Sequence, residues 1–253
     1  MDFAIETLLF LFFAAAVAGF MDTLAGGGGL ITIPALVVSG VPPLAALGTN
    51  KLQSSFGSGT SSFLLFKRKK IYWHELRPMM IAAFIGSVVG TIIVQFIDAK
   101  VLGFMIPLVL VIIAAYFITA PYLKLESTEP RMSAGLYQKT VVPAIGVYDG
   151  MFGPGTGSFL AVAGVSLRGL ELINATAIAK PLNFATNIAS LIVFIFAGQI
   201  MWLAGFTMIS GQMLGAWMGS HYLFKVNPKV LRILIVTICL IMLGQYWYKQ
   251  IAA

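Results

Sequence analysis

Apolar residues fill most of the chain in long runs, and short polar stretches divide these runs into two sets of five. The predicted boundaries are, in chain order, 4–24, 29–40, 43–66, 76–97, 101–119, 140–152, 157–167, 171–196, 202–223 and 230–248. A helix needs about 20 apolar residues to cross a bilayer, so most of these runs are long enough, whereas the second run of each set is too short. The first two segments of each set therefore form either two spans or one re-entrant hairpin.

A glycine-rich break precedes each short segment, in "DTLAGGGGLITIP" after Asp22 and in "DGMFGPGTGSF" after Asp149. Broken backbone at membrane depth is tolerated where it lines a cavity, and a helix that starts there points free N–H groups and a positive dipole end into that cavity. We interpret the breaks as amide donors for an anion, from Gly26, Gly27, Gly28, Gly29, Gly153, Gly155, Thr156 and Gly157. The alternative is close helix packing, as we expect for the GxxxG pairs 86/90 and 215/219.

The two sets align with each other as an internal repeat. "GFMDTLAGGGG" matches "GVYDGMFGPGT" at an offset of 127 residues, which places Asp22 over Asp149, and an offset of 129 then places Lys51 over Lys180. Each half crosses the membrane an odd number of times, so the second half must be inverted. We predict an N-terminal repeat at 1–119, a cytoplasmic linker at 120–139 and an inverted repeat at 140–253, a plan that places a transporter's substrate near the bilayer midplane.

Composition places the whole chain in a membrane. Of its 253 residues, 59% are hydrophobic and 10% are charged, and the mean hydropathy is +0.94, whereas a soluble domain has about 25% charged residues. The N-terminal run has no basic region and carries Asp2 and Glu6, so we predict a retained helix rather than a cleaved signal peptide. The fold class predicted is an all-α polytopic membrane protein with two inverted-topology repeats, interrupted or re-entrant helices and about 8–10 membrane segments.

The net charge of +7 does not indicate nucleic-acid binding, because most of the basic residues flank the membrane segments. With "KRKK" at 67–70 in the cytoplasm, alternation places twelve basic residues inside and only Lys100 and Lys249 outside. The loop that matches "KRKK" in the second half, at 197–200, has no charge. The positive-inside rule therefore supports inversion and predicts that both termini face the periplasm or the exterior.

Two lysines lie inside apolar segments and each begins a polar stripe on one helix face. The stripes are Lys51, Ser54, Ser58 and Ser61 in the first half and Lys180, Asn183, Asn187 and Ser190 in the second. A lysine at mid-bilayer costs roughly 2.5–3.5 kcal/mol and usually faces an interior pathway. We predict that these faces, with Asn50 and Gln53, line the substrate site. The alternative is an ion pair of Lys51 or Lys180 with Asp22 or Asp149, and in a mixed role the substrate displaces the aspartate.

No catalytic or metal-binding arrangement is visible. The two histidines, His74 and His221, are far apart, the single Cys239 lies in an apolar run, and no nucleophile triad or pair of carboxylates stands out. We therefore expect no enzyme activity, no metal and no cofactor.

Four stretches of the chain lie at the breaks and polar stripes described above: "GFMDTLAGGGGLITIPAL", "LGTNKLQ", "YDGMFGPGTGSF" and "ATAIAKPLNFATNIASL". In these stretches the sequence resembles the sulfite exporter TauE/SafE family of bacterial membrane transporters, and within it the YfcA-like members. The resemblance covers nearly the whole chain. It implies a transporter of the bacterial inner membrane that exports small sulfur-containing anions such as sulfite or sulfoacetate. Asn50, Lys51, Gln53, Lys180 and Asn183 fall on the family's motif positions, whereas Ile178 stands where many members have a histidine.

We therefore expect a secondary transporter that exports a small anion, either a sulfur oxyanion or an organosulfonate. An anion channel that uses the same cavity is the second hypothesis, and a membrane enzyme or assembly subunit is the third. The expected partners are the anion and the lipid bilayer, without nucleic acid, and no oligomeric state is predicted. The residues assigned to substrate are the eight break residues given above with Asn50, Lys51, Gln53, Ser54, Lys180, Asn183 and Asn187, and Asp22 and Asp149 are assigned to coupling or ion pairing.

Overall fold

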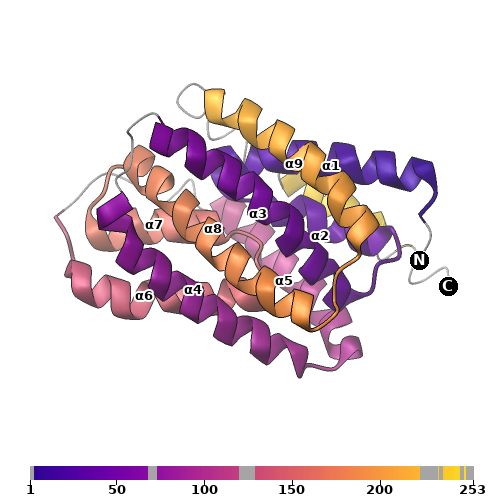
Figure 1. The fold of residues 1–253 in the computed structure, drawn as a ribbon, viewed down its shortest axis with the longest axis horizontal. Helices are drawn as coiled ribbons and strands as arrows, with labels where there is room; N and C mark the ends of the chain where they lie inside the picture. Colours follow the sequence, from indigo (N-terminus) through magenta and orange to yellow (C-terminus); the bar gives the residue numbers. More distant parts are fainter. Residues whose placement is uncertain are drawn as a thin grey trace.

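The computed structural model describes residues 3–67, 73–119, 129–222, 233, 236–245 and 248, and this part of the chain is all-helical (Figure 1). The labelled helices are α1 (Ile5–Ala25), α2 (Gly29–Val38), α3 (Pro43–Lys67), α4 (Trp73–Gln95), α5 (Ala99–Thr119), α6 (Ala134–Met151), α7 (Thr156–Arg168), α8 (Leu172–Phe196) and α9 (Trp202–Tyr222). A further apolar helix spans Val236–Gln245. The all-helical class predicted from the apolar runs is therefore confirmed.

Four of these helices are long and apolar enough to cross a membrane within the described ranges. They are Ile5–Ala25, Leu76–Gln95, Ala99–Tyr116 and Leu172–Phe196. Helices α2 and α7, which follow the glycine breaks, have only 10 and 13 residues. The breaks between α1 and α2 and between α6 and α7 thus lie at the glycine-rich stretches, as the sequence predicted.

Helix α6 begins at Ala134, six residues before the predicted start of this segment at 140, so its first turn lies within the predicted linker. Ser133 starts the helix because its side chain accepts a hydrogen bond from the Leu136 N–H at 3.3 Å, which satisfies a free amide of the first turn. The hydropathy pattern missed this turn because it is polar and exposed. The remaining linker residues 120–128, like 68–70 of the basic loop, lie outside the described residues.

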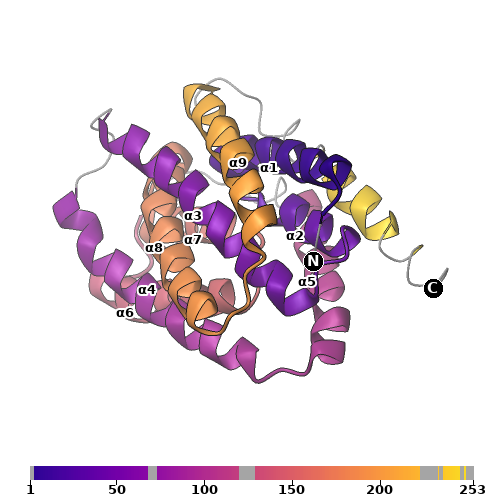
Figure 2. The same cartoon turned by 45° about the vertical axis from the view of Figure 1, so that its right-hand side comes forward.

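Glycines pack helices of opposite halves directly against each other. A Cβ atom on Gly215 of α9 would overlap the backbone of α1 at Ala16, and one on Gly90 of α4 would overlap the backbone of α6 at Val147. In both views α1 lies beside α9, and α4 beside α6 (Figures 1 and 2). The expectation that these GxxxG pairs serve close packing is confirmed.

The helices consequently sort into two packing units that do not coincide with the two halves of the sequence. The first packing unit contains α1, α2, α3 and α9, and the second contains α4, α6, α7 and α8. Helix α4 has joined the helices of the second half, and α9 those of the first half. The units meet mainly where α3 packs on α8, with a smaller contact between α1 and α7. We call this meeting line the α3/α8 seam.

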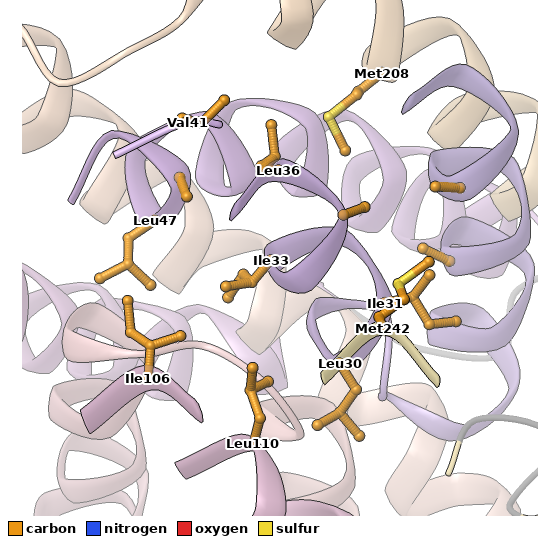
Figure 3. Packing of buried hydrophobic residues seen from close by; sticks show 14 of the residues in the cluster. Leu30, Ile31, Ile33, Leu36, Val41, Leu47, Ile106, Leu110, Met208 and Met242 are labelled. Carbon is orange, nitrogen blue, oxygen red and sulfur yellow. The ribbon is translucent and has the colours of Figure 1, made fainter. Parts of the chain in front are cut away.

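The short helix α2 lies inside the protein rather than on its surface. Leu30, Ile31, Ile33 and Leu36 are almost fully buried, and Figure 3 shows them among apolar side chains from other helices, including Leu47, Ile106, Leu110, Met208 and Met242. Burying this apolar surface stabilises α2 although the helix is too short to span a bilayer. The glycine break that precedes α2 is therefore held at the centre of the helix bundle.

Candidate functional site

The two glycine breaks touch each other at the α3/α8 seam. Gly26 ends α1 in the left-handed conformation (φ 73°), and its N–H donates to the Asp22 carbonyl at 2.7 Å. A Cβ atom on Gly26 would overlap the backbone of Gly157 and Ser158. The Ser158 hydroxyl also donates to the Ala25 carbonyl. Glycine is required at 26 both for the positive φ and for this approach of the second break.

Both buried lysines reach the second break. Gly153 has φ 94°, and a Cβ atom there would lie 3.1 Å from the Lys51 Nζ atom and 3.7 Å from the Asn50 amide nitrogen. A Cβ atom on Gly157 would lie 3.7 Å from the Lys180 Nζ atom. Lys51 and Lys180, which are 129 positions apart in the sequence, thus both lie close to the second break.

Lys51 forms a buried ion pair with Asp149. Its Nζ atom lies 2.7 Å from the Asp149 Oδ2 atom, and each side chain is only 1% exposed. The other carboxylate oxygen, Oδ1, accepts a hydrogen bond from the Thr156 hydroxyl at 2.7 Å. Because α3 belongs to the first packing unit and α6 to the second, this ion pair links the two units across the seam.

Lys180 has a different environment, although it is 1% exposed as well. Its ammonium donates to the backbone carbonyl of Asp22, and no carboxylate in the described part of the chain lies within ion-pair distance of it. The Asp22 carboxylate instead accepts a hydrogen bond from the Gly28 N–H at 3.2 Å. A buried ammonium that lacks a direct anionic partner is costly. The chemistry of the Lys180 site therefore favours an anion.

The predicted residues around Asn50 form one hydrogen-bonded group. The Asn50 side-chain oxygen accepts from the Thr32 hydroxyl at 2.6 Å and from the Gln53 amide at 2.8 Å. Gln53 also donates to the Ser54 hydroxyl at 2.9 Å. Among the described residues, the Gln53 Oε1 atom has no hydrogen-bond partner although the side chain is fully buried. One buried acceptor in this group is thus left without a donor in this state.

Other members of the two polar stripes hold helices together instead of joining the site. Ser61 shares a hydrogen bond with Thr23 of α1 at 2.8 Å, and Ser190 shares one with Ser87 of α4 at 2.7 Å. Asn187 donates to Asn183 at 3.3 Å, one turn away on α8. No hydrogen bond joins these two asparagines to the breaks within the described ranges, so the structure leaves their assignment as a prediction.

Sequence reasoning missed Thr32 and Ser158, each of which follows a glycine break within one helical turn. Thr32 binds Asn50, and Ser158 joins the two breaks. Their signal in the sequence was only their position beside the glycines. The described residues contain no group of three or more His, Cys, Asp and Glu side chains arranged to hold a metal ion.

Comparison with known proteins gives a consistent picture. The family model described as "Sulfite exporter TauE/SafE" matches residues 11–246. The chain is 42% identical to "Probable membrane transporter protein ORF9" of Sinorhizobium, over 94% of this chain and 91% of the relative. It is 40% identical to a "Probable membrane transporter protein" of Haemophilus influenzae (99% and 98% covered) and to "Probable membrane transporter protein YfcA" of Escherichia coli K12 (95% and 89%). No solved structure is significantly similar to the chain.

Proposed function

Because the chain belongs to the sulfite exporter TauE/SafE family of multi-pass membrane transporters, which are not enzymes, we propose that it exports a small anion. The proposed substrate is a sulfur oxyanion or an organosulfonate, which the family description supports. The proposed location is a bacterial inner membrane, with both termini facing outward and the loops at 67–70 and 120–139 in the cytoplasm.

The observation that carries the proposal is the buried ammonium of Lys180, which has no carboxylate at ion-pair distance within the described residues. An anion at this position supplies the missing negative charge. Gly157 lies beside it in the first turn of α7, where a helix offers no acceptor for its own N–H groups. One ammonium and adjacent amides suit an oxyanion, whose several oxygens each accept hydrogen bonds.

The closed geometry of the site supports a carrier rather than a channel. Lys51, Asp149 and Lys180 are each 1% exposed, and an ion pair links the two packing units across the seam. A carrier must open such a seam on one side at a time, whereas a channel needs a continuous path. The α1/α9 and α4/α6 pairings support inverted repeats, because the repeat alignment converts one pairing into the other.

Counterflow in proteoliposomes tests this proposal. Vesicles loaded with unlabelled anion are assayed for exchange of sulfite, thiosulfate, sulfoacetate, sulfate and chloride. We expect saturable exchange of at least one sulfur-containing anion, its loss in Lys180→Gln, and its retention in the exposed-site control Lys139→Gln. Anion currents without counterflow would favour the channel hypothesis. Exchange no faster than in empty liposomes for every anion would contradict the proposal.

A further inference from the structure

The repeat alignment makes two lysine–aspartate pairs equivalent. Lys51 aligns with Lys180 and Asp149 aligns with Asp22, so the counterpart of the Lys51–Asp149 pair is Lys180–Asp22. Each pair joins a lysine of one half to an aspartate of the other half. In the structure the first pair is formed at 2.7 Å. The second is open: the Asp22 carboxylate accepts from the Gly28 N–H, and the Lys180 ammonium donates to the Asp22 backbone carbonyl without a described carboxylate at ion-pair distance.

We propose that the two ion pairs form in turn, so that Asp22 is the partner of Lys180 in the opposite-facing state, where the Lys51–Asp149 pair is broken. The inference rests on the proposed transport function. When inverted repeats exchange their conformations, the membrane side to which the site opens is exchanged as well. A state in which the first half adopts the present conformation of the second therefore forms Lys180–Asp22 and leaves Lys51 without a carboxylate.

The local geometry makes this exchange a short one. Lys180 already donates to the backbone of Asp22, so the Asp22 side chain is attached to the residue that the ammonium contacts. To form the pair, the carboxylate exchanges its 3.2 Å hydrogen bond from the Gly28 N–H for a contact with the Lys180 ammonium, so it keeps a charge-assisted hydrogen bond in both states. In the opposite-facing state, Asp149 leaves Lys51 and takes the equivalent position against Gly155, the residue that aligns with Gly28.

The exchange also keeps the charge of the site constant. In either state one aspartate neutralises one lysine, while the other aspartate caps the half-helix that follows its break, where the helix dipole stabilises a negative charge. One lysine is then available to the anion in each state: Lys180 in the present state and Lys51 in the opposite state. The two lysines thus bind the substrate successively rather than together. The anion passes from Lys180 to Lys51 when the ion pair across the α3/α8 seam changes from Lys51–Asp149 to Lys180–Asp22.

Spin-label distance measurements on the full chain without anion test this exchange. In a Cys239→Ala background, one label pair replaces Phe63 and Ile173, which lie on α3 and α8 on opposite sides of the seam. The second replaces Leu44 and Ile192, the positions related to them by the 129-residue offset. The matched variants are Asp149→Asn, which removes the pair seen here, and Asp22→Asn, which removes its counterpart.

We expect the two variants to shift the populations in opposite directions. The distance distribution of the first label pair in Asp149→Asn should resemble that of the second label pair in Asp22→Asn. Likewise, the distribution of the second label pair in Asp149→Asn should resemble that of the first label pair in Asp22→Asn. Identical distributions in the two variants, or shifts in the same direction, would overturn the proposal. The doubly neutral variants Lys51→Gln/Asp149→Asn and Lys180→Gln/Asp22→Asn leave no buried charge unpaired and should show the same opposition if a single variant folds poorly.

This measurement is independent of transport. Failure of the exchange with normal anion binding at Lys180 would refute only the alternation of ion pairs. Opposite shifts in a protein that exchanges no anion would refute the proposed function and leave the alternation standing.

Discussion

The Lys51 ammonium lies 2.7 Å from the Asp149 carboxylate, although the two residues come from different halves of the chain and both are 1% exposed. An ion pair had been the alternative interpretation of the intramembrane lysines, and the structure shows it for Lys51. Lys180 lacks such a partner among the described carboxylates. Two residues that occupy equivalent positions in the repeat therefore have different surroundings in this state: Lys51 is ion-paired across the seam, and Lys180 is the proposed site of the anion.

Removing Lys51 should destabilise the protein more than removing Lys180. Lys51→Gln leaves the Asp149 carboxylate buried without its counter-ion, and breaking a buried pair in this way typically costs about 3–5 kcal/mol. Denaturant unfolding of the purified protein in detergent measures the difference. The double variant Lys51→Gln/Asp149→Asn should recover most of the loss, because neither member of this pair is left buried without its counter-ion. A Lys51→Gln protein as stable as the wild type would contradict a closed ion pair.

Gly26→Ala should abolish transport and lower the yield of folded protein. The added Cβ meets the Gly157 and Ser158 backbone and also strains a left-handed residue. Gly40 is the matched control, because it has φ 87° but no atom within 4 Å of its added Cβ. Gly40→Ala should therefore suffer only the backbone strain of roughly 1–2 kcal/mol and keep its flux. Equal effects of the two changes in the liposome assay would mean that the contact between the breaks is unimportant.

Gly215→Ala should weaken the packing of α9 on α1. Its Cβ would overlap the Ala16 carbonyl and lie 2.7 Å from the Phe20 nitrogen, and overpacking of this kind costs roughly 1–3 kcal/mol. At Gly103 in α5 the added Cβ of Gly103→Ala meets no heavy atom of the described residues within 4 Å, so this change should be neutral or slightly stabilising, since alanine favours helix over glycine by about 1 kcal/mol. Thermal unfolding of both variants checks this difference, and a stable Gly215→Ala protein would refute the tight α1/α9 contact.

The proposed topology predicts the accessibility of three segments that lie partly or wholly outside the described residues. Cysteines introduced in 67–70 and 120–139 should be labelled only from the cytoplasm, and one at residue 253 only from the outside. The physical reason is the excess of lysine and arginine in the predicted inner loops. Labelling of the two loops from opposite sides would remove the basis for inverted repeats.

Much of the fold follows from local patterns, because long apolar runs and glycine breaks determine helices directly. Every described helix lies on a predicted segment, and the largest error was the polar first turn of α6, where the cap at Ser133 begins the helix before the apolar run does. The equivalence of Lys51 and Lys180 also followed from the repeat. The position of each lysine relative to the carboxylates did not.

The features that the sequence did not predict depend on packing between distant helices. Which aspartate approaches Lys51 is decided by how α3 meets α6, and the exchange of α4 and α9 between packing units is decided by glycine contacts across the bundle. Ser61 and Ser190 were predicted on the site faces by their spacing along the helix, yet each meets a hydroxyl on a neighbouring helix. Spacing along a helix identifies a face but not the surface that covers it.

The central claim is that the Lys180 ammonium binds the transported anion, and direct titration of purified protein with sulfite and sulfoacetate by calorimetry tests it. Lys180→Gln should bind about ten- to a hundredfold more weakly, because loss of a charge-assisted contact costs roughly 1.5–3 kcal/mol, while unfolding in detergent is little changed. Lys139→Gln, which neutralises an exposed lysine, should bind as the wild type does. Wild-type affinity in a folded Lys180→Gln protein would contradict the account.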